Sequence, residues 1–518
     1  MRHSQVRATP GIAVFAVFVF LLLAVPKANI RVGPIPVYIV DLMLVILLLE
    51  AHRFPPMRPG QRRFTGLVGT LFLLALASEA IGALTFGTLQ ASAYVTGRTI
   101  LAFSVFLLTS QMVRTPRDVE IVLRAVVLGL LVTASLMILT SLPMTRGAVS
   151  DIVFSQRFLE PATPEVQGAF GETETGIRGR TLVGVSILGA TFINVAWPLA
   201  ALLLLWPWRI DPPWRSLALV ACLLAPMGVL LSYSRGPILG SVLIVLCALL
   251  FGLRFVRRGV LVPVMVGTVL VLSVGVTSQI FFFDRLTNRS TAIFDAPFAD
   301  ERESERILAY IEPFRHLVTT PRFLVFGEGI AIRYAETQAT PEQAGKATHA
   351  VFAMAYYSYG MIAAVLYIVL LVRALALAAT LSRQRAAAVV PISQSVFLSL
   401  VALVPWLAFG HAAVSTPRGA MLFFFVLGLT SALVHICAPV RQSLSTFGPS
   451  HAQRHSPAFR QTLRIDHVPG RDLPPSGGAD RAVLAALESR DALVADGGRR
   501  PGAGQAPLRG GPRLSRLW

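Results

Sequence analysis

Apolar stretches, each about as long as a membrane-spanning helix, recur along this chain of 518 residues. A helix that crosses a bilayer needs about 20 predominantly apolar residues, because the hydrocarbon core is about 30 Å thick. Short polar segments rich in Arg, Pro and Gly separate the stretches, and no soluble domain of ordinary size interrupts them. Because lipid offers no hydrogen bonds to the backbone, we predict an all-α, polytopic membrane protein.

Twelve transmembrane helices are predicted, with boundaries defined to within a few residues. They cover residues 11–25, 35–49, 65–83, 94–113, 119–142, 182–205, 217–231, 237–251, 260–280, 350–372, 388–409 and 419–435. The first resembles a secretory signal, but no small-residue cleavage site precedes Pro26, so we expect this helix to be retained. Hydrophobic residues make up 54% of the chain and charged residues only 14%, which agrees with lipid as the main solvent.

Arginine is concentrated in the short loops that follow the even-numbered predicted helices. These residues are Arg53, Arg58, Arg62, Arg63, Arg114, Arg117, Arg209, Arg215, Arg254, Arg257, Arg258, Arg373, Arg383 and Arg385. Short loops rich in Lys and Arg stay in the cytoplasm, so both termini are predicted to be cytoplasmic and the long loops 143–180 and 281–349 extracytoplasmic. Topology thus accounts for the net charge of +19, and we do not expect nucleic-acid binding.

The composition changes near the end of the last predicted helix. We expect residues 1–437 to form the transmembrane domain and residues 438–518 a cytoplasmic, basic and mostly disordered tail. The tail is rich in Pro, Gly, Ser and Arg, and it cannot bury enough apolar surface to fold.

Arg235 lies between two predicted helices that are joined by a tight turn. A guanidinium keeps its charge, so this position requires an anionic partner, a water-filled cavity or a membrane interface. The predicted topology places it on the outer side together with Arg98, Arg178, Arg180 and Arg418. If these side chains converge, their ligand is a polyanion such as a lipid-linked diphosphate. Taken one by one, the other four fit interfacial anchors better.

His349 precedes the predicted helix 350–372 and ends the longest outer loop. Histidine exchanges protons near neutral pH, so His349 is a candidate base for a sugar hydroxyl. In the alternative interpretation, His349 is simply a polar residue at the start of a helix, and the aromatic residues after it, including Tyr357, form a belt at the membrane interface.

No metal site is predicted from the acidic and cysteine side chains. The three cysteines lie in apolar runs with neither metal-ligand nor disulfide spacing, and no pair of carboxylates accompanies His349 or Arg235. Asp41, near the outer end of the predicted helix 35–49, has no partner in the sequence and is a candidate intramembrane acid.

Four short motifs occur in an informative order. Gly189-Ala190-Thr191-Phe192-Ile193-Asn194 comes first, and Ser234-Arg235-Gly236 begins a predicted helix. Phe326-Gly327-Glu328-Gly329-Ile330 lies in the longest outer loop, and His349 leads into Tyr359-Gly360. Together these motifs resemble the O-antigen ligase and O-antigen polymerase superfamily over roughly residues 30 to 435.

The resemblance implies a bacterial inner-membrane glycosyltransferase of the GT-C class. Such a protein transfers a glycan from an undecaprenyl-diphosphate-linked donor to a lipid or glycan acceptor outside the cytoplasm, with neither cofactor nor metal. By this likeness Arg235 holds the diphosphate and His349 acts as base or positions the acceptor. The supporting residues are Ser234, Gly236, Asn194 and Tyr357. Many members have Asn after the histidine, where this chain has Ala350.

Several alternatives stay open. Ligase and polymerase share the motifs, and neither the sugar nor any protein partner follows from the sequence. A transporter or flippase of an anionic lipid-linked solute would also use outward-facing arginines. Such proteins often contain internal repeats, and the two halves of this chain show no convincing repeat, so we prefer glycan transfer.

Overall fold

The structure is a computed structural model. It describes residues 8–24, 29–32, 35–51, 59–141, 145, 181–182, 186–205, 210–232, 234–255, 311–332, 350–383, 390–409, 414 and 416–446. The chain divides into two compact units, Met1–Phe447 and Gly448–Trp518, and the second unit lies outside the described residues.

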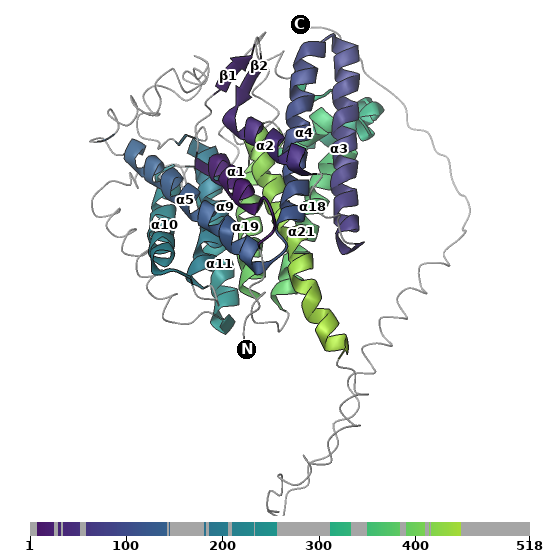
Figure 1. Cartoon of the computed structure of the whole chain (residues 1–518). Helices are drawn as coiled ribbons and strands as arrows, with labels where there is room; N and C mark the ends of the chain where they lie inside the picture. The colour runs from purple at the N-terminus through teal and green to yellow at the C-terminus, as the bar shows by residue number, and fades with distance from the viewer. Residues whose placement is uncertain are drawn as a thin grey trace, which may run out of the picture. The chain divides into compact units, whose positions relative to one another are not determined.

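The described part of the first unit is almost entirely helical (Figure 1). Its α-helices are α1 (Ile12–Ala24), α2 (Ile39–Glu50), α3 (Pro59–Phe86), α4 (Leu89–Met112), α5 (Pro116–Ser141), α9 (Ser186–Leu204), α10 (Pro212–Leu231), α11 (Arg235–Phe255), α17 (Val351–Tyr359), α18 (Met361–Ser382), α19 (Val390–Phe409) and α21 (Pro417–Thr446). A short 3-10 helix, η2, covers Pro321–Leu324.

Within these described helices, eight segments are long and apolar enough to cross a membrane. Two shorter apolar segments, Ile12–Ala24 and Gly236–Leu250, match the first and eighth predicted helices. The prediction of a helical, polytopic membrane protein is confirmed at this level. The predicted helix 260–280 lies outside the described residues, so the total of twelve stays a prediction.

A two-stranded hairpin is an exception to the all-α prediction. Strands β1 (Asn29–Val32) and β2 (Ile35–Tyr38) pair antiparallel, with Asn29 opposite Tyr38, directly before α2 (Figure 1). We predicted that residues 35–49 form one helix, and the first four residues are instead strand. The cause is local, because a Gly-Pro pair between two short runs rich in β-branched residues favours a hairpin.

The predicted helix 350–372 is broken at Gly360. This residue has φ 93°, a left-handed conformation that glycine adopts without steric cost, and it separates α17 from α18. A Cβ added at Gly360 would lie 2.7 Å from the carbonyl carbon of Val325. Close approach of the outer-loop chain therefore requires glycine here and prevents a continuous helix.

The helices pack through small residues and aromatic side chains. α21 lies against α4 (Figure 1), and α9 contacts α5, α10 and α19. At the first of these contacts a Cβ on Gly428 would lie 2.6 Å from the Thr109 side chain, and the rings of Phe103 and Phe424 are 4.2 Å apart between centroids. Such close approach is typical of helix packing in membranes, where van der Waals contact replaces the hydrophobic effect.

Candidate functional site

The structure describes six of the ten predicted site residues in full: Arg98, Arg418, Asn194, Ser234, Gly236 and Tyr357. For Arg235 the backbone is described as the first residue of α11, without its side chain. His349, Arg178 and Arg180 lie outside the described residues, as does the rest of the predicted loop 143–180 apart from residue 145.

Arg98 forms a buried ion pair with Asp41. The guanidinium Nη2 of Arg98, on α4, lies 3.1 Å from Oδ2 of Asp41, on α2, and both side chains are only 10% exposed. The guanidinium also lies over the rings of Tyr38 and Tyr94, at 4.1 and 4.8 Å from their centroids. The Tyr38 N–H points to the same carboxylate oxygen at 3.4 Å. Asp41 thus has a partner that the sequence did not identify.

Arg418 joins this cluster from a third helix. It is the second residue of α21, is 6% exposed, and interacts electrostatically with Asp41, Tyr38 and Arg98. The structure therefore brings together two of the predicted arginines that lie 320 positions apart in the chain (418 − 98). Among the described members of the cluster, Arg98 pairs directly with Asp41, and Arg418 lies near enough to interact with the same carboxylate electrostatically.

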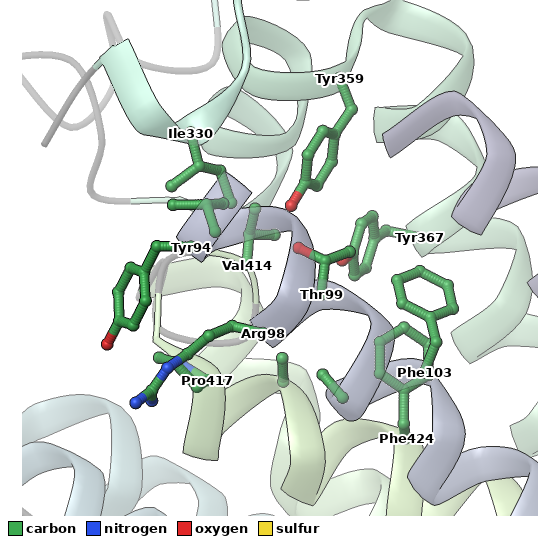
Figure 2. A pocket seen from close by; sticks show the side chains of 13 residues that line it. Tyr94, Arg98, Thr99, Phe103, Ile330, Tyr359, Tyr367, Val414, Pro417 and Phe424 are labelled. Carbon is green, nitrogen blue, oxygen red and sulfur yellow. The ribbon is translucent and has the colours of Figure 1, made fainter. Parts of the chain in front are cut away.

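A cavity of about 40 Å³ lies beside this cluster. Figure 2 shows the hydroxyl groups of Thr99 and Tyr359 facing it, while the guanidinium of Arg98 points away toward the side of Tyr94. Phe103 and other aromatic side chains form much of the remaining wall. Since one water needs about 10–15 Å³ of this space, the cavity holds a few waters and not a sugar.

Asn194 fastens the first turns of α11 to α9. Its buried amide nitrogen donates to the carbonyl of Pro237 at 2.5 Å, and its oxygen accepts from the Ser241 hydroxyl at 2.6 Å. A Cβ on Gly240 would lie 3.0 Å from the same amide nitrogen. Asn194 therefore positions the helix end at which Arg235 lies, which gives a physical basis for its predicted supporting role.

Ser234 and Gly236 flank Arg235 at that helix end. The carbonyl of Ser234 accepts a hydrogen bond from the N–H of Ile238 at 3.1 Å. The N–H of Ser234 donates to the Ser232 hydroxyl at 3.2 Å. Arg235 is consequently the first residue of α11, where backbone N–H groups lack helical partners and the helix dipole is positive. A cation and a helix N-terminus at one position both favour an anion.

The motif around Glu328, in the predicted outer loop, is attached to the end of α17. The N–H groups of Glu328 and Gly329 donate to the carbonyls of Tyr357 and Ser358 at 2.9 and 3.0 Å. Tyr357 thus contributes its backbone to this junction. The motif Phe326–Ile330 and the pair Tyr359-Gly360, which are separate in the sequence, are therefore in direct contact.

Two residues of α3 complete this junction, and sequence reasoning missed both. Ser78 accepts the N–H of Gly327 at 3.1 Å, and its hydroxyl donates to the carbonyl of Tyr359 at 3.4 Å. The Glu79 carboxylate, 1% exposed, accepts the N–H groups of Ile330 and Ala331. Glu79 is the one charged residue of the predicted helix 65–83, and that signal could have identified it.

His316, in the described end of the outer loop, was also missed. Its Nδ1 lies 3.2 Å from the Tyr356 hydroxyl, and its ring meets Phe323 edge-on at 4.8 Å between centroids. Burial raises the pKa of Tyr356 to about 12, with smaller contributions from Tyr357 and Glu328. The phenol therefore stays protonated near neutral pH and can donate to His316.

Two comparisons with known proteins identify no relative of this chain. A scan against models of known protein families finds no match, and a search among curated proteins finds none either. The family resemblance therefore depends on the four short motifs, and it stays a prediction.

Proposed function

We propose that this protein transfers a glycan from an undecaprenyl-diphosphate-linked donor to a hydroxyl of a lipid or glycan acceptor at the extracytoplasmic face of the bacterial inner membrane. The observation that carries the proposal is the proximity of two buried arginines from different helices, Arg98 of α4 and Arg418 of α21, beside Asp41. Guanidinium groups brought together from two helices present several N–H donors in a fixed fork geometry, which suits an anionic ligand. Bidentate guanidinium contacts match phosphate oxygens.

Asp41 has a definite part in this proposal. By pairing with Arg98, it holds the guanidinium in place before any ligand binds. The pair lies at the junction between β2 and α2. A preorganised cation stabilises developing negative charge without reorganisation during the reaction. Asp41 therefore positions the diphosphate site and does not itself react.

The proposed reaction is a glycosyl substitution. The acceptor oxygen forms a bond to the anomeric carbon while the bond from that carbon to the diphosphate oxygen breaks. The leaving undecaprenyl diphosphate takes the bonding electrons, and arginines stabilise its charge. By the family likeness, His349 receives the acceptor's proton. Arg235, at the N-terminus of α11, is the proposed second element of the diphosphate site.

A binding experiment tests the carrying observation. Purified protein in nanodiscs is titrated with undecaprenyl diphosphate, and the affinities of wild type, Arg418→Gln and Arg383→Gln are compared. Arg383 is an exposed arginine at the end of α18 and serves as the matched control. Loss of one charged contact of about 1.5–3 kcal/mol should weaken binding by Arg418→Gln roughly tenfold or more. Equal affinity of all three proteins would overturn the proposed site.

Product analysis separates transfer from transport. A transferase releases undecaprenyl diphosphate without its glycan, whereas a flippase returns the intact lipid-linked glycan on the other face. In a deletion strain, single repeat units on the acceptor indicate a polymerase, and untransferred long chains indicate a ligase. Intact lipid-linked glycan as the sole product in reconstituted vesicles would favour the transporter alternative.

A further inference from the structure

The helical segment 311–319 of the predicted outer loop has an apolar face that the described part of the chain leaves largely exposed. Ile311, Phe314 and Val318 are 43%, 55% and 83% exposed. They follow one another at intervals of three and four residues, so they lie on one side of a helix with 3.6 residues per turn. These three large, exposed side chains therefore form one apolar stripe along the helix.

Two other sides of this helix have different surroundings. Pro313 is buried, and His316 and Leu317 are partly buried against the rest of the molecule. Glu312 and Arg315 are exposed on a polar side. The helix thus has three sides. One side faces protein, one is polar and suited to water, and the apolar side with Ile311, Phe314 and Val318 lies next to both. A helix at a membrane surface has this arrangement, because it contacts protein, water and lipid at once.

The segment around Glu328, which follows segment 311–319 in the sequence, lies near the end of a membrane-spanning helix. The carbonyl of Glu328 packs directly against Gly82, and Gly82 lies four residues before Phe86, the end of the apolar span Phe64–Phe86 (86 − 82). At 1.5 Å per residue, this contact is about 6 Å from the end of the span. Leu84, beyond Gly82 on the same helix, is 83% exposed, as expected for a lipid-facing side chain.

Segment 311–319 is firmly connected to this boundary. Its His316 contacts Tyr356 of α17, and its Phe314 stacks on Phe352 of the same helix, with ring centroids 5.5 Å apart and planes at 21°. The 3-10 helix η2 then leads into the segment that Glu79 and Ser78 hold against α3. Leu324, at the end of η2, is 49% exposed and extends the apolar surface.

We propose that segment 311–319 is an interfacial helix whose apolar face, Ile311, Phe314 and Val318, inserts into the adjacent leaflet of the bilayer. On the predicted topology this is the outer leaflet. The exposed Arg315 lies on the same segment, where it can meet lipid phosphates. The inference goes beyond glycan transfer and holds independently of it, because it requires only a membrane surface.

A site-directed fluorescence experiment tests this placement in the full-length protein. The native cysteines are replaced, and single cysteines at Val318 and at Glu312 are labelled with an environment-sensitive fluorophore. Both variants are reconstituted in phosphatidylcholine vesicles with and without bromine on the upper acyl-chain carbons. Because an interfacial helix buries its apolar face about 5–10 Å into the headgroup and acyl boundary, brominated lipid should quench the Val318→Cys label by roughly half. The label at Glu312→Cys should lose little emission and should be quenched by aqueous iodide instead.

The possible outcomes are distinct. A label at position 318 that iodide quenches and bromine does not would overturn the proposal, because the face would then be in water. Protection from both quenchers would also overturn it and would indicate contact with another protein surface. Leu324→Cys provides a second reporter should the Val318→Cys protein not assemble, with the same quenching by brominated lipid expected.

Discussion

Removing the carboxylate of Asp41 should destabilise the protein more than removing its partner Arg98. In the wild type, Asp41 interacts with both Arg98 and Arg418, so the described cluster carries a formal charge of +1 (two arginines minus one aspartate). Asp41→Asn raises this charge to +2, whereas Arg98→Gln lowers it to zero. Uncompensated buried charge is costly, so the two single substitutions should differ although they break the same ion pair.

The magnitude follows from the geometry of the pair. With the interacting nitrogen and oxygen 3.1 Å apart and both side chains 10% exposed, screening by water is limited. At an effective dielectric constant of about 20, two unit charges about 4 Å apart interact by about 4 kcal/mol, and breaking a buried pair typically costs about 3–5 kcal/mol. We therefore expect Asp41→Asn to lower the free energy of unfolding by about 3 kcal/mol and the apparent Tm by roughly 5 °C or more.

Thermal unfolding of the purified variants provides the measurement, and the double variant provides the control. Asp41→Asn with Arg98→Gln restores the formal charge of +1, so it should be more stable than Asp41→Asn alone. Undecaprenyl diphosphate should also raise the Tm of Asp41→Asn, because it supplies negative charge to the two arginines. Equal destabilisation by Arg98→Gln and Asp41→Asn, or a double variant that is the least stable of the three, would show that net charge does not control the stability of this cluster.

Two further predictions concern buried polar contacts. Asn194→Leu removes the hydrogen bonds to Pro237 and Ser241 and should cost about 2 kcal/mol, with a loss of undecaprenyl diphosphate binding that exceeds the loss of folded protein. Glu79→Gln keeps one acceptor oxygen but turns an NH2 donor toward one of the two backbone N–H groups, those of Ile330 and Ala331, that the carboxylate accepts. It should cost about 1–3 kcal/mol, measured as faster proteolysis of the predicted outer loop.

Controls for these two variants are available in the chain. Ser216→Ala alters an exposed hydroxyl that bonds within its own helix, so it should leave both stability and binding unchanged. Glu312→Gln changes an exposed carboxylate of the outer loop and should leave proteolysis at the wild-type rate. Wild-type binding by Asn194→Leu, or wild-type proteolysis of Glu79→Gln, would show that the contact does not position its segment.

Membrane-spanning helices were predictable because hydropathy is a local property. Several predicted spans begin and end within a few residues of the described helices, as for α5 (Pro116–Ser141), predicted over 119–142, whereas α21 (Pro417–Thr446) is longer than the predicted span 419–435. Two errors had different causes. The β1–β2 hairpin was hidden by the apolar character of its residues, and the break at Gly360 is imposed by the approach of Val325 from a distant part of the chain.

The candidate site was only partly predictable. Arg98 and Arg418 are predicted on the outer side with Arg235, each by itself fitting an interfacial anchor better than a ligand, and Asp41 has no partner in the sequence pattern. Their meeting was not predictable, since a pattern within one helix contains no information about which other helices it contacts. Glu79 and His316 were missed for the same reason, because their partners, Ile330 and Tyr356, are remote in sequence.

The sequence by itself determined that this chain spans a membrane several times, because about 20 apolar residues in succession are stable as a helix in lipid whatever surrounds them. It also determined the presence of a few charges that need partners. Only the tertiary structure decided which partners they have. The packing of α2, α4 and α21 brings Arg98 and Arg418 near Asp41, and the docking of residues 327–331 on α3 and α17 places Glu79 at Ile330. Contacts between distant segments depend on how whole helices pack, so a candidate site built from several helices becomes visible only in three dimensions.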